Sequence, residues 1–190
     1  MNKYILIFVA VVILIGGYFA FKSFTNTEPV AAQYGPLDSQ FLIEGIPVKL
    51  TNGLAETEAA PGSASKVVTK YFGNDYVTDL DGDGSDDVVF LVTQQTGGSG
   101  IFYYVVAAVH TGIGYAGSDG YLLGDRIAPQ STNASQNPRH KNAVGVNYPD
   151  RAPGEPMTAY PRVGKSVYLK LDRATMMWGI VEPDFEGESR

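Results

Sequence analysis

The chain has 190 residues, of which 44% are hydrophobic and 18% are charged, with a formal net charge of -6 at pH 7. These values are typical of one globular domain and exclude an intrinsically disordered chain. The negative charge argues against nucleic acid as a partner, because binding to phosphates needs a basic surface. The lack of cysteine excludes disulfides, thiolate zinc sites, a thiol nucleophile and a lipid-modified cysteine.

The first 22 residues are expected to form a single transmembrane anchor. Tyr4 to Phe21 is an uninterrupted run of apolar residues and glycine, about the length needed to cross a bilayer. Lys3 and the free amino terminus precede the run, which favours a cytoplasmic N-terminus and an extracytoplasmic remainder. A cleaved signal peptide is the main alternative, although the small residues Val30-Ala31-Ala32 lie far beyond the apolar run.

The rest of the chain divides into a linker, a folded domain and a tail. Residues 23–39 are polar and contain Pro29, Gly35 and Pro36, which is typical of a tether. We expect the β domain to occupy residues 40–182 and an acidic tail to occupy residues 183–190.

The folded part is expected to consist of short strands separated by turns. Apolar or alternating runs predict strands at 41–43, 46–51, 54–58, 66–72, 76–80, 88–93, 102–110, 121–123, 143–148, 166–171 and 176–181. Asn52-Gly53 is a strong signal for a two-residue hairpin turn, and Gly73-Asn74 is expected to break a strand. Val88 to Thr93 is nearly all apolar, so this strand should be buried on both faces. Loops are expected at 112–120, 127–142 and 149–164.

The fold class follows from these patterns. No stretch after the apolar run has a clear helical period, and the 12 tyrosines and 9 phenylalanines favour strands. The sequence therefore predicts an all-β fold, either a single sandwich or a partly open barrel, preceded by one N-terminal transmembrane helix.

The most informative stretch is Asp79-Leu80-Asp81-Gly82-Asp83-Gly84-Ser85-Asp86-Asp87. Counted from Asp79, carboxylates fall at loop positions 1, 3, 5 and 9, and a glycine at position 6 permits the sharp reversal that lets them converge. Ca²⁺ takes about six to eight oxygens, and a backbone carbonyl is natural at position 7. The spacing predicts a structural Ca²⁺ site formed by the side chains of Asp79, Asp81, Asp83 and Asp87 and the backbone of Ser85.

Other interpretations of this loop fit less well. An EF-hand is excluded, because its position 12 is a glutamate followed by a helix, whereas position 12 here is Phe90 in an apolar strand. A plain hairpin turn at Asp81-Gly82-Asp83-Gly84 is the simpler alternative, but a turn needs no carboxylates at four alternating positions. Magnesium fits less well than calcium, because it prefers a rigid octahedral site in which it retains waters.

The loop and the strand after it resemble the strand-loop-strand calcium loops of FG-GAP repeats, as in integrin α-chain propellers. The resemblance implies the same five ligands and leaves Asp86 exposed. A propeller would need several copies of the loop, so the resemblance is confined to the loop and does not extend to the fold.

Four longer stretches of the chain from Phe41 onward carry a second resemblance. They are Tyr71 to Asn74, Thr96 to Ala108, Leu123 to Gln130 and Val146 to Thr158. On these residues the chain is similar to a family of uncharacterised envelope-anchored bacterial proteins, which usually have alanine where this chain has Pro149. The resemblance implies an anchored envelope protein and implies no activity.

Other candidate motifs are weak. The stretch 112–117 fits the glycine pattern of dinucleotide sites, but a turn follows it where a helix is required. His110 is expected to be partly buried at a strand end and His140 to lie in a solvated loop, and neither has a spacing partner for zinc. Asp125-Arg126 and Asp150-Arg151 are expected to form ion pairs that fix loops.

The sequence leaves three functions open. The first is a non-enzymatic module that presents loops, including the proline-rich segment 149–161, to an envelope or extracellular protein. The second is an envelope hydrolase acting on glycan or peptide, which requires Asp125, Arg126, Asp150 or His110 to converge in a pocket. The third is a small-ligand or inhibitor-type β-barrel, which would need an open apolar mouth lined by tyrosine and phenylalanine.

Overall fold

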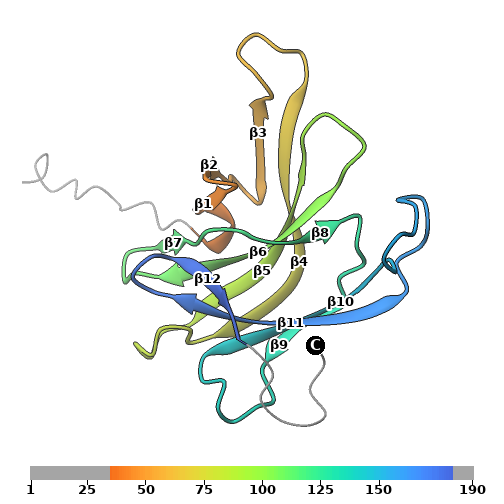
Figure 1. Cartoon of the computed structure of the whole chain (residues 1–190). Helices are drawn as coiled ribbons and strands as arrows, with labels where there is room; N and C mark the ends of the chain where they lie inside the picture. Colours follow the sequence, from red (N-terminus) through yellow and green to blue (C-terminus); the bar gives the residue numbers. More distant parts are fainter. Residues whose placement is uncertain (1–34, 182–190) are drawn as a thin grey trace, which may run out of the picture. The chain divides into compact units, whose positions relative to one another are not determined.

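The computed structural model describes residues 35–181, and this part of the chain is all-β (Figure 1). The predicted anchor at residues 1–22, the linker up to residue 34 and the predicted acidic tail at 183–190 lie outside the described residues. Within residues 35–181, no helix has the length and apolar character needed to span a membrane.

The strands of the described part form three antiparallel sheets. The largest has the order β3-β4-β5-β6-β7, with β8 also pairing with β6, and its strands are β3 (Leu54–Glu58), β4 (Lys66–Thr78), β5 (Asp87–Gln95), β6 (Phe102–His110), β7 (Tyr115–Gly117) and β8 (Tyr121–Asp125). The second has the order β12-β11-β10-β9 and consists of β9 (Ser131–Ala134), β10 (Ala143–Asp150), β11 (Val163–Asp172) and β12 (Met177–Ile180). The third is a hairpin of β1 (Gln40–Ile43) and β2 (Ile46–Lys49).

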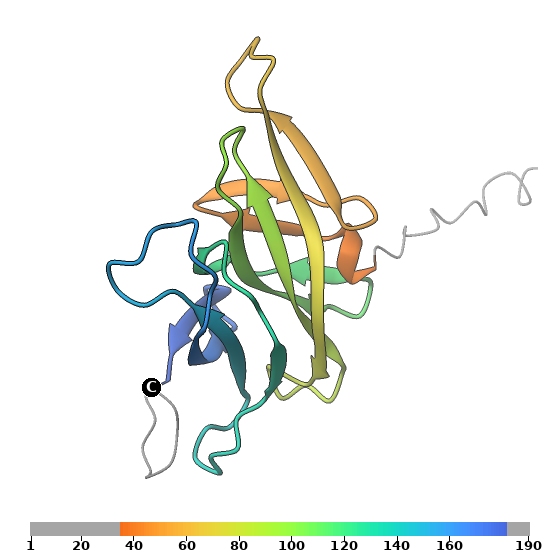
Figure 2. The same ribbon diagram turned by 90° about the vertical axis from the view of Figure 1, so that its right-hand side faces the viewer.

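The central strands β5 and β6 are buried on both faces because they lie between the other two sheets. Successive side chains of a strand point to opposite faces, so alternate residues enter two separate cores. Val89 and Leu91 join the core shared with the four-stranded sheet, and Phe90 and Val92 join the core shared with β1 and β2. Figure 2 shows the four-stranded sheet, in teal and blue, on one side of the yellow and green strands. The sequence predicted that the strand at 88–93, which is part of β5, is buried on both faces, and this is confirmed.

The prediction of an all-β fold is confirmed, and the sheets stack without closing into a barrel. Two strands were missed. β7 lies in the expected loop 112–120 and β9 in the expected loop 127–142. Both are short and polar or glycine-rich, and they form because β6 and β10 offer them backbone partners.

The expected strand break at Gly73-Asn74 is a bulge inside one long strand. β4 continues from Lys66 to Thr78, and its register with β5 shifts on either side of Gly73. Gly73 and Asn74 have φ of 117° and 58°, which places the extra residues in conformations that glycine and asparagine tolerate.

The predicted turn at Asn52-Gly53 is present, but its hairpin opens at once. Thr51 and Leu54 exchange two backbone hydrogen bonds of 2.9 and 3.2 Å around the turn. Beyond this bridge, β2 pairs with β1 and β3 pairs with β4, so the two arms belong to different sheets. The divergence leaves space between β2 and β3.

The last residues of the predicted linker contact this turn. Pro36–Asp38 form a 3-10 turn, and the carbonyl of Leu37 accepts a hydrogen bond of 2.9 Å from the N–H of Gly53. The carboxylate of Asp38 accepts one of 2.8 Å from the N–H of Asn52. These residues therefore belong to the folded domain.

Close backbone contacts attach β1 to the segment between β7 and β8. The N–H of Leu42 donates to the carbonyl of Ser118 at 3.2 Å, and the N–H of Gly120 donates to the carbonyl of Leu42 at 2.7 Å. A Cβ atom at Gly117 would lie 2.2 Å from the carbonyl oxygen of Gln40. Glycine at this position is what allows β1 to lie so near.

Candidate metal centre

The acidic loop connects β4 to β5, as the sequence predicts, and it brings three carboxylates together. Asp79, Asp81 and Asp87 each offer an oxygen atom, and these atoms all lie within 4.8 Å of one another. Two oxygens bound to one Ca²⁺ at about 2.4 Å each can be at most about 4.8 Å apart. The three side chains therefore have the spacing needed to share one cation.

Asp87, the first residue of β5, is fully buried. Its Oδ2 accepts a hydrogen bond of 2.9 Å from the N–H of Leu80, and its Oδ1 accepts one of 2.8 Å from the N–H of His110. Burial raises the pKa of Asp87 above its usual value, and the charges of Asp81 and Asp83 add to this, against the two N–H donors. A buried carboxylate beside like charges is the environment that a bound cation would stabilise.

Asp79 organises the backbone of the loop. Its Oδ1 accepts hydrogen bonds from the N–H groups of Gly82 at 2.6 Å and Asp83 at 3.2 Å, and its Oδ2 accepts one from Gly84 at 3.0 Å. The Gly84 N–H holds the pKa of the Asp79 carboxyl below its usual value despite the opposing effect of burial. Gly82 and Gly84 have φ of 82° and 85°, so the reversal depends on glycine.

Asp81 contacts a residue that sequence reasoning missed. Nη1 of Arg173, in the turn between β11 and β12, lies 2.5 Å from Oδ2 of Asp81. The Asp81 side chain is 6% exposed and that of Arg173 is 48% exposed. The guanidinium therefore compensates part of the negative charge of the loop. Nothing in the sequence indicates this pair, because the two residues are far apart in the chain and lie in connections that belong to different sheets.

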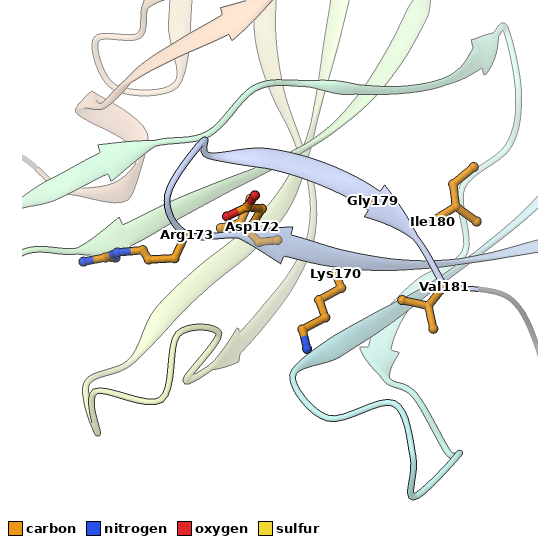
Figure 3. Close-up of a pocket in the computed structure, with 7 residues that line it drawn as sticks. Lys170, Asp172, Arg173, Gly179, Ile180 and Val181 are labelled. Atoms are coloured by element: carbon orange, nitrogen blue, oxygen red, sulfur yellow. The ribbon is translucent and has the colours of Figure 1, made fainter.

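Arg173 also lines a broad hollow of about 480 Å³ along β11 and β12. Figure 3 shows Arg173 at the turn of this hairpin, pointing away from Lys170 and Val181, which line the same hollow. The side chains that line it do not converge on one point, so the hollow adds no ligand to the acidic loop.

The remaining predicted ligands lie outside the group of three. Asp83 is exposed, and its Oδ1 accepts a hydrogen bond of 2.7 Å from the N–H of Ser85. Asp86 is exposed, as expected. Of the five predicted ligands, the structure thus brings together Asp79, Asp81 and Asp87, while Asp83 and Ser85 bind each other in the same loop.

The candidate hydrolase residues form a structural network at the ends of β8 and β10. Asp125 and Arg126 form the predicted ion pair at 2.9 Å. The guanidinium of Arg151 donates to the carbonyls of Asp125 and Arg126 at 3.2 and 3.0 Å. Asp150 pairs with Lys165 at 2.6 Å, where a pair with the Arg151 side chain was expected. These contacts occupy the carboxylates and hold the two loops in place.

His110 lies far from this network. Asp125 is opposite Phe102 at the start of β6, and His110 ends the same strand, roughly 26 Å away at about 3.3 Å per residue. His110 therefore does not converge with Asp125, Arg126 and Asp150, the other candidate catalytic residues. His140, expected in a solvated loop, is instead buried, with its Nδ1 2.8 Å from the hydroxyl of Ser135.

The glycine pattern at 112–117 forms no dinucleotide site. The N–H of Thr111 donates to the carbonyl of Gly114 at 2.9 Å, and β7 follows directly. Among the described residues, no helix begins there to receive a pyrophosphate.

No protein-family model, curated protein or solved structure matches this chain. The function is therefore inferred from the geometry of the chain's own residues. In the acidic loop, that geometry suits the binding of a hard cation by oxygen atoms.

Proposed function

We propose that this protein is a membrane-anchored, extracytoplasmic β domain that is stabilised by one structural Ca²⁺ and works as a binding module of the cell envelope. The calcium site depends on the convergence of the Asp79, Asp81 and Asp87 carboxylates. Ca²⁺ suits an all-oxygen loop of flexible geometry better than Mg²⁺ does. Its role would be to hold the β4–β5 connection against its neighbours.

The proposed location is supported by the sequence. The apolar run from Tyr4 to Phe21 has the length of a membrane span, and the long matches from Phe41 onward resemble envelope-anchored proteins. The N-terminus would then be cytoplasmic and the β domain extracytoplasmic.

The binding role is supported by the loop between β10 and β11. Its base is closed by a hydrogen bond of 2.9 Å from the N–H of Arg162 to the carbonyl of Asp150. Within it, the Glu155 carboxylate accepts from the N–H of Ala152 at 2.9 Å. The loop presents Tyr160 with 88% of its surface exposed. A large side chain held outward by an ordered loop is a natural contact for a partner protein.

Melting of the full-length chain with Ca²⁺ and with EDTA tests the calcium site. A cation that binds only the folded form stabilises it by about 2.7 kcal/mol at a free concentration of 100 times its Kd. We expect Ca²⁺ to raise the melting temperature by several degrees, and Asp81→Ala to melt lower than the wild type even in excess Ca²⁺. Asp86→Ala, an exposed neighbour, should behave as the wild type. An equal midpoint with Ca²⁺ and EDTA would remove calcium from the proposal.

A small-ligand function is a second candidate, because a specific hollow favours it. Phe102 and Tyr104 line an open space of about 320 Å³ beside β6. The hydrolase alternative has weaker support, since His110 ends β6 whereas Asp125, in β8, lies opposite Phe102 at the start of β6.

A further inference from the structure

Two adjoining hollows lie at the end of the six-stranded sheet that is remote from the acidic loop. The larger, of about 320 Å³, is lined by Glu44, Gln94, Thr96, Phe102, Tyr104 and Leu122. The smaller, of about 190 Å³, lies between β2 and β3 and shares Gln94 and Thr96 with the larger. Asp87 begins β5 and Gln94 lies seven residues further on, so roughly 23 Å separates the hollows from the acidic loop.

The smaller hollow exists because the β2–β3 hairpin opens after the Thr51–Leu54 bridge. Its walls are mainly apolar and include Pro47 and Val48 of β2 and Ala55 of β3. Pro47 has no N–H to offer to an added strand, so this wall is unsuited to binding a peptide by β-augmentation. The space is better suited to the apolar body of a small molecule.

The charge and polarity of the lining residues indicate which kind of ligand the two hollows would bind. Among the described residues that line the two hollows, the charged ones are Glu44 and Glu58, and both are acidic. Gln94 is buried and donates to the hydroxyl of Thr69 at 3.1 Å. An apolar space with carboxylates at its margins is complementary to a positively charged ligand.

Glu44 is held in place by its backbone and by Tyr104. Glu44-Gly45 is a two-residue turn in which both residues have positive φ, 52° and 75°, an arrangement that is uncommon for glutamate. The hydroxyl of Tyr104 donates to Oε1 of Glu44 at 3.2 Å. Burial and the Glu44 charge raise the pKa of Tyr104 to about 12, so the hydroxyl remains a donor at neutral pH. The carboxylate is thereby oriented at the margin of the larger hollow.

We infer that these hollows bind a small organic cation, with its ammonium group beside the Glu44 carboxylate and the Phe102 ring and its apolar body directed between β2 and β3. A carboxylate and an aromatic ring that line the same hollow are a combination that recognises ammonium groups. Tyr104 acts here as a positioning residue for Glu44. The inference rests on the second candidate function, the binding of a small ligand, because it names the ligand class, and it does not depend on Ca²⁺.

A series of probes that share one body and differ in charge tests this inference. The full-length chain in a non-ionic maltoside, which has no ammonium group, is titrated by calorimetry with 3-phenylpropylamine, 3-phenylpropanol and 3-phenylpropanoate. We expect the amine, which is protonated at neutral pH, to bind about tenfold more tightly than the alcohol, and the carboxylate to bind more weakly than either. Added salt should weaken the amine alone. Equal affinity of amine and alcohol, or no binding of the amine at about 10 mM, would overturn the inference.

Matched variants locate the site. Glu44→Gln should weaken the amine about fivefold or more and leave the alcohol unchanged. Glu56→Gln removes the same charge from β3 at an exposed position paired with Lys66 and should change neither affinity. Tyr104→Phe keeps the ring and should weaken the amine without affecting the alcohol. An equal loss of amine affinity in Glu44→Gln and Glu56→Gln would contradict this location. If Glu44→Gln does not fold, the preference of the wild type for the amine over the alcohol still tests whether the site selects a positive charge.

Repeating the titrations in EDTA separates the inference from the calcium proposal. If the amine still binds and the melting temperature is the same with Ca²⁺ and with EDTA, the organic-cation site is supported and the calcium site is refuted. Melting that responds to Ca²⁺ in a protein that does not distinguish amine from alcohol refutes the cation site and leaves the calcium site in place.

Discussion

Nη1 of Arg173 lies 2.5 Å from Oδ2 of Asp81, and this ion pair joins the β11–β12 turn to the β4–β5 loop. The two connections belong to different sheets, so the contact holds one layer of the domain against another. Arg173 supplies positive charge at the place where a bound cation would supply it. The guanidinium and the cation therefore have overlapping roles, which can be separated by mutation.

We expect Arg173→Gln to destabilise the calcium-free protein by about 1 kcal/mol, a value kept small because Arg173 is half exposed. With saturating Ca²⁺ the loss should shrink, because the cation replaces the missing charge, and Ca²⁺ affinity should rise. Urea unfolding in EDTA and in Ca²⁺ measures the loss of stability and the change in Ca²⁺ affinity. Arg162→Gln, which removes an exposed arginine paired with Glu155, is the control and should show no dependence on Ca²⁺. The same loss in both conditions for Arg173→Gln would separate this ion pair from the proposed cation site.

Asp87→Ala should be among the most destabilising single changes in the loop. Asp87 is fully buried and accepts the N–H groups of Leu80 and His110, which would lose their acceptors. Each unsatisfied buried donor costs about 1–3 kcal/mol, so we expect a loss of about 3 kcal/mol or more. Asp86→Ala, at the exposed neighbouring position, should change the free energy of unfolding by less than about 0.5 kcal/mol. Similar urea midpoints for the two variants would contradict the structural role of Asp87.

The pKa of Tyr104 predicts a loss of stability at high pH. Burial, with the charge and hydrogen bond of Glu44, raises this pKa from 10.0 to about 12 in the folded chain. Because the folded pKa is raised, the contribution to stability is complete below pH 10 and is lost as the pH rises from about 10 to 12. Two pKa units correspond to roughly 2–3 kcal/mol, and Tyr104 is only 3% exposed.

Tyr104→Phe tests this pH dependence. Its free energy of unfolding is measured with urea between pH 9 and 12. Over this range it should fall by about 2–3 kcal/mol less than that of the wild type. Ultraviolet titration of tyrosinate should show one fewer late-titrating tyrosine. A parallel decline in the two proteins would show that Tyr104 ionises normally.

Gly117→Ala should weaken the attachment of β1. The added Cβ would lie 2.2 Å from the carbonyl oxygen of Gln40 and 2.7 Å from the ring of Phe41, so the strand must move. We expect a loss of about 2 kcal/mol, the usual cost of overpacking. Gly98→Ala is a matched control, because nothing lies within 4 Å of its added Cβ. Equal thermal midpoints for both variants would show that β1 can shift without cost.

Local patterns in the sequence were sufficient for several features. The apolar run 88–93 predicted a central strand, and its alternating residues do enter two cores. Asn52-Gly53 predicted a two-residue turn that is present. The spacing of the acidic loop predicted four converging carboxylates, and three of them, Asp79, Asp81 and Asp87, do come together, whereas Asp83 does not. These features depend on side-chain alternation and turn geometry within a few residues, which a sequence records directly.

Other features depend on residues that are distant in the chain. β7 and β9 carry no strand pattern and form because β6 and β10 offer them hydrogen-bonding edges. The Asn52-Gly53 hairpin opens because its two arms find better partners in different sheets. The pairs Arg173–Asp81 and Tyr104–Glu44 exist only after the layers have packed. The sequence thus determined most of the strands and the acidic loop. Tertiary packing decided where β7 and β9 form, which charges meet and where the hollows lie, because those contacts require distant segments to lie side by side.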